Sequence, residues 1–332
     1  QRVEILKALA NDATYLIFDE PTAVLTPQEI DELMEVMRSL RDEGRAIVFI
    51  THKLREVRAV ADDITVIRRG KVVGSAEPSA PEGELAAMMV GRSVSLQVDK
   101  EPAKPGAERL VITDLTVASP SGAVAVDQLS LSVRGGEIVC IAGVQGNGQT
   151  ELAEALLGTM TPLSGTAVLD GVDIAHASPA KTIKAGLGFV PEDRHRDGFV
   201  GEFSIAENLV LNNLDAYSRN GSLQLKAIAD NAVARIQEFD IRSESHTQPV
   251  NALSGGNQQK VVLARELSRP LSLLLASQPT RGVDVGAIEF LHKRIVEERD
   301  VGTAVLIVST ELEEVESLAD RIAVMYRGKI VG

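Results

Sequence analysis

The fold is decided by an apolar run that leads into a glycine-rich turn, Ile138-Val139-Cys140-Ile141-Ala142-Gly143-Val144-Gln145-Gly146-Asn147-Gly148-Gln149-Thr150. The apolar run predicts a buried strand over 137–142, and a helix is expected from about Thr150. A turn in this setting is typical of a phosphate-binding loop with the pattern Gly-x-x-x-x-Gly-Lys-Ser/Thr. The chain departs from that pattern at Gln149, where the pattern requires lysine.

Phosphate binding by this loop would rest on its backbone. Glycines let N–H groups converge on phosphate oxygens, and the helix N-terminus adds its positive dipole end. A lysine about 4 Å from a phosphate charge is worth up to roughly 4 kcal/mol at an effective dielectric of about 20. We therefore expect a loop that can hold a nucleotide but stabilises transition-state charge poorly. Its candidate residues are Gly143, Gly146, Asn147, Gly148, Gln149 and Thr150, of which Thr150 can reach a magnesium ion.

The first 74 residues of the chain recur at its end. Leu16, Pro21, Thr22, Asp62 and Gly70 return 258 positions later as Leu274, Pro279, Thr280, Asp320 and Gly328, with no insertion. A period this long indicates duplicated domains, because solenoid repeats are much shorter. We expect residues 1–74 to be the C-terminal part of a first domain, 75–108 a linker and 109–332 a complete second domain, so that the chain opens inside a longer protein.

Alternating apolar runs and helical patterns outline both copies. In the first copy they predict helices over 1–9, 27–41 and 54–61, strands over 15–18 and 46–50, and a hairpin at 69–70. In the linker, 84–90 forms a short amphipathic stretch. In the second domain we expect antiparallel strands over 110–117 and 123–133, and a mainly helical region over 205–240 with a polar loop at 218–222. The fold class is α/β with a parallel sheet.

The two copies differ where charged groups stand. In the first copy an apolar strand ends in Asp19 and Glu20, and His52 ends the next strand. The second copy has Ser277, Gln278 and Thr310 at the corresponding positions, and none of these can carry a charge or act as a general base. One copy is therefore expected to be competent for acid–base chemistry and the other is not.

A second motif, Leu253-Ser254-Gly255-Gly256-Asn257-Gln258, predicts another anion-binding helix start. Here the chain resembles ABC-type ATPases, whose signature is Leu-Ser-Gly-Gly-x-Gln, and the resemblance extends over nearly all 332 residues. It implies a P-loop NTPase fold of ABC type, duplicated, with a parallel-sheet core, an antiparallel β subdomain and a helical subdomain. Its ligands would be ATP and Mg²⁺.

The resemblance also implies roles for single residues. Asp19 would hold Mg²⁺ through water, Glu20 would polarise the attacking water, and His52 would touch the γ-phosphate. Glu192 stands where the family has a glutamine, and Asp284 stands at a position that reaches the opposite site. In the first copy, Thr26 replaces that aspartate.

Sites in this family are shared between halves. The first copy's Asp19, Glu20 and His52 would face Ser254, Gly255, Gly256 and Asn257 of the second, and the halves would pair within one chain. We therefore expect one competent site and one degenerate site.

The segment Pro191-Glu192-Asp193-Arg194 and residues 278–286 resemble the double-domain ATPases of bacterial simple-sugar importers. Within that group, residues 146–152, residues 194–198 and the neutral Ser277-Gln278 look most like the nucleoside-importing branch. The implied partners are membrane permeases and a separate substrate-binding protein. The implied location is the cytoplasmic face of the cell membrane, as a peripheral subunit. Alternatives are a soluble ABC ATPase outside transport and a non-hydrolytic regulatory module. The chain alone, lacking the first copy's phosphate loop, is expected to hydrolyse ATP negligibly.

Composition agrees with these expectations. The net charge of −13 argues against a nucleic-acid partner, since phosphate binding normally needs basic surface. Trp is absent and aromatic residues make up 3% of the chain, which disfavours base-stacking platforms. The single cysteine, Cys140, lies in the apolar strand and is expected to be a buried thiol.

Overall fold

The computed structural model describes residues 3, 7, 13–22, 25, 27–95 and 98–332. The chain forms two compact units, Gln1–Leu96 with Asp284–Glu289, and Gln97–Val283 with Phe290–Gly332. The break at 96–97 falls inside the segment 75–108 for which the sequence predicts a linker. Thr26 and most of the expected helix over 1–9 lie outside the described residues.

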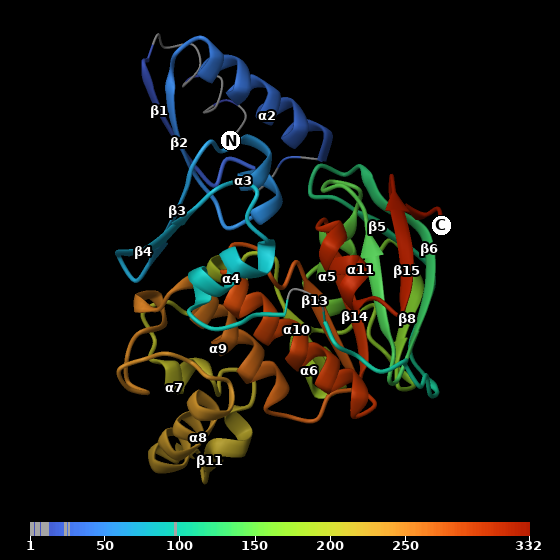
Figure 1. The fold of residues 1–332 in the computed structure, drawn as a ribbon. Coiled ribbons are helices and arrows are strands. Elements are labelled where there is room, and N and C mark those ends of the chain that lie inside the picture. Colours follow the sequence, from blue (N-terminus) through green and yellow to red (C-terminus); the bar gives the residue numbers. More distant parts are fainter. Residues whose placement is uncertain (1–2, 4–6, 8–12, 23–24, 26, 96–97) are drawn as a thin grey trace. The chain divides into compact units, whose positions relative to one another are not determined.

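The first unit is built on a parallel strand pair, β1 (Tyr15–Asp19) and β2 (Ala46–Ile50), in register from Tyr15 opposite Ala46 to Asp19 opposite Ile50. Between them runs α2 (Pro27–Asp42), whose buried Met34 and Met37 pack with Leu16 and Phe18 of β1. After β2 come α3 (Leu54–Val60), the antiparallel hairpin of β3 (Ile64–Arg68) and β4 (Lys71–Ala76), and α4 (Glu82–Val90) (Figure 1). The strands predicted over 15–18 and 46–50, the helices over 27–41 and 54–61 and the hairpin at 69–70 are confirmed.

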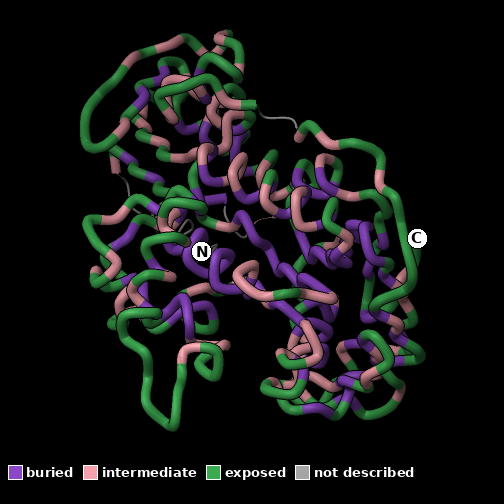
Figure 2. The backbone as a smooth tube through the Cα atoms, turned by 90° about the horizontal axis from the view of Figure 1, so that it is seen from below, coloured by how far each residue is buried: buried purple, intermediate pink, exposed green. Residues whose placement is uncertain are grey.

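The second unit is built on a six-stranded sheet in the order β10 (Leu187–Val190), β13 (Leu273–Ser277), β14 (Ala304–Ser309), β7 (Ile138–Ala142), β15 (Arg321–Tyr326), β16 (Lys329–Ile330). The first five strands are parallel and β16 is antiparallel to β15. Every residue of β13 and β14 is buried, and Figure 2 shows such buried stretches inside green, exposed turns. Runs buried on both faces are typical of parallel sheets, and they explain why these strands read as continuous apolar sequence.

The same core contains an antiparallel sheet, whose strands lie in the order β6 (Val124–Arg134), β5 (Glu108–Ala118), β8 (Ser164–Leu169), β9 (Val172–Asp173). Leu152 and Leu156 of α5 (Gln149–Leu157) share one apolar core with both sheets. The expected antiparallel pair over 110–117 and 123–133 is confirmed by the β5–β6 pairing.

The remaining helices of the second unit are α6 (Pro179–Lys184), α7 (Ile205–Asn208), α8 (Leu225–Glu238), α9 (Gly255–Leu267) and α11 (Leu312–Leu318); α10 (Val285–Asp300) begins in the segment grouped with the first unit. The polar loop predicted at 218–222 was wrong, because β11 (Ser218–Arg219) pairs with β12 (Ser222–Leu223). Asn220 and Gly221 join them with φ of 51° and 77°. An Asn-Gly pair with both φ positive is the preferred two-residue hairpin turn, a signal that the sequence carried.

None of the helices in the described ranges has both the length and the apolar character that crossing a membrane requires.

Candidate functional site

The glycine-rich loop lies between β7 and α5, where the sequence predicts it. Gly148 has a φ of 104°, and a Cβ there would come 2.1 Å from the carbonyl oxygen of Ala125. Only glycine fits such a position, because the left-handed backbone is strained for other residues and the space is already filled. Asn147 anchors the loop to the turn after β15, since its Oδ1 accepts from the Arg327 amide at 2.8 Å. The loop is thus held in a fixed shape by its neighbours.

Gln149 folds back onto its own loop and is 6% exposed. Its Oε1 accepts from the Asn147 amide at 3.0 Å, and its Nε2 donates to the Val144 carbonyl at 3.1 Å. The Asn147 amide is one of the backbone donors that such a loop turns toward phosphate. In this structure that donor is satisfied by a neutral side chain, where the motif would place a cation.

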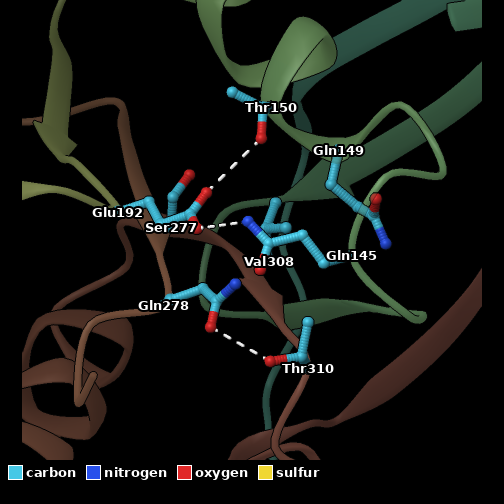
Figure 3. Close-up of a pocket in the computed structure, with 8 residues that line it drawn as sticks. All are labelled: Gln145, Gln149, Thr150, Glu192, Ser277, Gln278, Val308 and Thr310. Atoms are coloured by element: carbon cyan, nitrogen blue, oxygen red, sulfur yellow. Dashed lines mark hydrogen bonds between the residues drawn. The ribbon is translucent and has the colours of Figure 1, made fainter. Parts of the chain in front are cut away.

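Glu192 follows β10 and lies in a pocket with the loop (Figure 3). Its Oε1 accepts from Gln145 Nε2 at 2.6 Å and pairs with the Arg281 guanidinium, and its Oε2 accepts from Thr150 Oγ1 at 3.4 Å. The pocket is lined by Gln145, Gln149, Thr150, Glu192, Ser277, Gln278, Val308 and Thr310. Glu192 therefore supplies the carboxylate of this lining, and the strand-end residues Ser277 and Gln278 add only neutral groups.

The first unit holds the charged counterpart of these strand ends. Asp19 is exposed at the end of β1, and Glu20 follows it with a φ of 46° and its amide bonded to the Ile50 carbonyl at 2.9 Å. The carboxylate oxygen Oε1 of Glu20 lies 2.7 Å from Nδ1 of His52. Thr51 donates to the other Glu20 oxygen at 3.4 Å. A carboxylate and an imidazole, both partly exposed, thus meet at the carboxyl ends of adjacent parallel strands.

The second copy keeps this geometry with neutral partners. Gln278 has a φ of 47°, its amide donates to the Val308 carbonyl at 2.7 Å, and Thr310 Oγ1 donates to Gln278 Oε1 at 3.0 Å. A two-residue contact at the strand ends is therefore preserved while its charge and its basicity are lost.

Beneath the strand ends, both copies keep the same buried hydrogen bond. Thr22 Oγ1 donates to Glu56 at 2.8 Å, and Thr280 Oγ1 donates to Glu314 at 2.8 Å. Burial raises the pKa of Glu56 above its ordinary value, and the hydrogen bond from Thr22 opposes that rise. In the second copy His292 Nε2 adds a contact to Glu314 at 3.2 Å. The repeat thus extends from sequence to individual side-chain contacts.

The residues Ser254, Gly255, Gly256 and Asn257 form the start of α9. Asn257 Nδ2 donates to Ser254 Oγ at 2.8 Å, and its Oδ1 accepts from the Arg242 amide at 2.8 Å. The first amides of a helix have no intrahelical partner, so this end can bind an anion. Asp284 is exposed and caps α10, since its Oδ1 accepts from the Ala287 amide at 3.0 Å.

The structure brings together two separate groups of the predicted residues. Glu192 joins the loop residues in one pocket, and Glu20 joins His52 in the other unit. Sequence reasoning missed Gln145 and Arg281, which both contact Glu192. Gln145 could have been considered as one of the polar residues inside the loop, whereas nothing in the sequence pairs Arg281 with a residue 89 positions away.

Comparisons with known proteins agree with this architecture. A family model described as "ABC transporter" matches residues 126–281. Over its full length the chain is 50% identical to the nucleoside import ATP-binding protein NupA of Lactococcus lactis, and 49% identical to the guanosine import ATP-binding protein NupO of Bacillus subtilis. It spans 66% of the length of each. The glucose import ATP-binding protein TsgD13 of Haloferax volcanii is 46% identical, and the chain spans 61% of it.

Among solved structures, the dimeric bacterial ABC transporter cassette MJ0796 superposes with a TM-score of 0.59 at 21% identity, covering 67% of this chain and 97% of that one. At this identity the likeness shows the fold alone, and it confirms the expected α/β cassette. Taken with the family match and the relatives at about 50% identity, it identifies the chain as a member of the ABC transporter ATP-binding protein family.

Proposed function

We propose that this chain belongs to the ATP-hydrolysing subunit of an importer, and that the whole protein has one competent composite site and one degenerate site. The observation that carries the proposal is the paired contact at the strand ends. Glu20 and His52 meet at 2.7 Å in the first copy, while Gln278 and Thr310 meet at 3.0 Å in the second. The geometry is duplicated, and only one copy retains groups that can move or orient a proton.

Glu20 is the group best suited to orient the attacking water. Its carboxylate stands at the carboxyl end of a parallel strand, where ligands bind in open α/β sheets. In-line attack on a γ-phosphate needs an oriented water, and a carboxylate can accept its proton. His52 holds one oxygen of Glu20 and can reach toward the phosphate from the next strand. The loop amides at the start of α9, at Ser254, Gly255, Gly256 and Asn257, would contact the nucleotide from the other half. Asp284 would reach that site as well.

Magnesium fits the donors of the first copy. Asp19 presents an exposed carboxylate next to Glu20, and hard cations prefer such oxygens. When bound with ATP, Mg²⁺ neutralises charge on the phosphates. In the second copy, Thr150 and Glu192 offer two oxygens 3.4 Å apart, but Ser277 offers no carboxylate and its buried Oγ has no hydrogen-bond partner among the described residues. The second copy therefore fits the ion less well.

The names of the relatives support a proposal for the cargo class. Their names describe import of nucleosides, guanosine and glucose, and the nucleoside and guanosine importers have the highest identities of these three. We propose import of nucleosides or simple sugars, with membrane permeases and a separate substrate-binding protein as partners. The ATPase would be peripheral, on the cytoplasmic face of the cell membrane. Residues 1–332 alone are expected to turn over ATP negligibly, because the competent copy would need its own phosphate loop.

The proposal is tested by ATP turnover of the full-length protein assembled with its permease. Glu20→Gln should lose nearly all activity, because the amide cannot accept the proton. The matched control is Gln278→Ala at the equivalent position of the second copy, which should keep most of it. Substantial turnover in Glu20→Gln, or a comparable loss in Gln278→Ala, would overturn the assignment of the competent site.

A further inference from the structure

The segment Pro191-Glu192-Asp193-Arg194 contains an arginine that the proposed function does not use. Arg194 is half-buried, and its guanidinium donates to the Arg281 carbonyl at 2.8 Å, to the Gly282 carbonyl at 3.1 Å and to Gln258 Oε1 at 3.3 Å. Burial lowers the pKa of Arg194 from its ordinary value. One side chain thus joins three parts of the second unit: the segment after β10, the turn before Asp284, and the first turn of α9.

A second contact runs in the opposite direction between two of these parts. The Arg281 side chain pairs with Glu192, while the Arg281 carbonyl accepts from Arg194. The residues 192–194 and 281–282 therefore hold each other through two reciprocal contacts, which we call the 192–281 clasp. Charge-assisted hydrogen bonds of this kind are stronger than neutral ones, so the clasp fixes the spacing of the two segments.

The local backbone conformation positions Arg194 for its contacts in the 192–281 clasp. Residues Arg194–Gly198 form a single π-helical turn, and Asp193 caps it by accepting from the amides of His195 at 3.0 Å and Arg196 at 3.2 Å. The Phe199 amide closes the turn on the Arg194 carbonyl at 3.2 Å. The three charged residues of the segment therefore make different contacts, since Glu192 pairs with Arg281, Asp193 caps the turn, and Arg194 bridges to the other two parts.

The packing at Gly255 shows how tightly the three parts meet. A Cβ on Gly255 would lie 2.6 Å from Nη2 of Arg194 and 3.0 Å from the Gly282 carbonyl oxygen. The guanidinium and the 281–282 backbone therefore occupy the space that a side chain at the first residue of α9 would need. The close approach explains a glycine at this position independently of any ligand.

We propose that Arg194 is a positioning residue that sets the start of α9 and the segment leading to Asp284 against the Glu192 segment. The proposal rests on the proposed function, in which Ser254, Gly255, Gly256, Asn257 and Asp284 serve the first copy's site. In this proposal the 192–281 clasp and the contact of Arg194 with Gln258 couple the Glu192 segment to residues 281–282 and to the start of α9. Arg194 itself touches none of the loop residues 143–150 in the described contacts, so it acts through the groups that it holds.

Hydrogen exchange of chain 1–332, followed by mass spectrometry, tests the clasp without relying on activity. Backbone amides of Arg194→Gln should exchange about tenfold faster than those of wild type in peptides covering 279–286 and 253–259. The reason is that losing a hydrogen bond to a charged group changes the equilibrium constant for local opening by roughly one order of magnitude or more. Peptides of β5 and β6 should be unchanged. The control is Arg196→Gln, which removes the same charge from the same turn but only loses exposed contacts to Asp197 and Glu154.

Arg194→Lys keeps the charge but loses the planar guanidinium, whose Nε, Nη1 and Nη2 each donate to a different acceptor, so it should exchange between wild type and Arg194→Gln. It also serves as the test variant if Arg194→Gln fails to fold. Exchange in both Arg194 variants equal to that of Arg196→Gln would overturn the proposal.

In the full-length protein with its permease, Arg194→Gln should lower kcat about tenfold and leave the KM for ATP unchanged. A raised KM at constant kcat, or an unchanged kcat despite faster exchange, would overturn the positioning role. Failure of the proposed function is distinguishable from this outcome: Glu20→Gln would then retain turnover, whatever the exchange data show.

Discussion

The buried ion pair Arg299–Asp320 has an exposed counterpart in the first copy, so it tests directly how burial changes the contribution of an ion pair to the free energy of unfolding. Arg299 is 1% exposed, and its guanidinium contacts Asp320 at 3.0 Å, Asp300 at 2.6 Å and the Glu101 carbonyl at 2.9 Å. In the first copy the same contact joins Arg41 and Asp62, also at 3.0 Å, with side chains 41% and 67% exposed. The perturbation is Arg299→Met, which keeps the aliphatic stem and removes the charge.

The loss in free energy of unfolding depends on the hydrogen bonds that the Asp320 carboxylate keeps after the substitution. Breaking a buried ion pair by removing one partner costs about 3–5 kcal/mol, because the other charge is left uncompensated. Asp320 still accepts from Lys100 Nζ at 3.0 Å and from the Ile138 amide at 2.9 Å. We therefore expect the lower end, about 3 kcal/mol. For a domain of this size class, that loss lowers the Tm by roughly 6–12 °C.

The assay is thermal and urea unfolding of chain 1–332, monitored by circular dichroism, with Arg109→Met as the control in the same unit. Arg109 pairs with Asp170 at 3.1 Å, with side chains 45% and 30% exposed. Exposed pairs contribute about 0–1 kcal/mol, so this variant should unfold close to wild type. The reasoning is refuted if Arg299→Met destabilises the second unit no more than Arg109→Met does.

Three further predictions concern single side chains. Gln149→Lys should raise the affinity of the second copy's site for ATP by at least about tenfold, because a cation replaces the neutral group beside the phosphate position. Titration with a fluorescent nucleotide checks this prediction. An unchanged affinity would show that the shape of the loop, and not its charge, limits binding. The only thiol, Cys140, is fully buried and burial raises its pKa, so a thiol-specific reagent should modify the folded chain at least about a hundredfold more slowly than the urea-unfolded chain; equal rates contradict the buried strand. Burial raises the folded-state pKa of Glu56, so the folded protein binds the Glu56 proton more tightly than the unfolded chain does. The free energy of unfolding that this proton contributes is therefore lost as pH rises from the ordinary carboxyl value of 4.5 through the raised folded-state pKa. Glu56→Gln removes that dependence and should gain stability relative to wild type over this range, measured as urea midpoints; a constant difference from about pH 4 to about pH 7 speaks against it.

Most secondary structure could be predicted because local pattern decides it. The buried strands β7, β13 and β14 are continuous apolar runs. The repeat also relates β13 and β14 to β1 and β2 of the first copy. The loop at 143–150 and the helix start at 254–257 follow from glycine spacing. The hairpin at 218–223 shows the limit of reading polarity alone, because its Asn220-Gly221 turn is polar and also structured.

Side-chain partners over long sequence distances could not be predicted. The sequence marks Glu192 as a departure from the family pattern, but it does not place Arg281, Gln145 and Thr150 around that carboxylate. It marks Gln149 as a lost cation, but only the fold shows this side chain accepting from the loop's own Asn147 amide. Such contacts depend on where the parallel strands bring their loops together.

What the sequence determined by itself is the repeat, the family and the loss of charge in the second copy, since these depend on which residues stand at matched positions. The tertiary structure decided how that loss is accommodated. Thr310 and Gln278 form a hydrogen bond where His52 and Glu20 form theirs in the first copy. The Arg194 guanidinium donates hydrogen bonds to residues 64 and 88 positions further along the chain. A residue's type fixes what chemistry it can do, but the packing of strands and helices fixes which groups come within hydrogen-bonding distance of it.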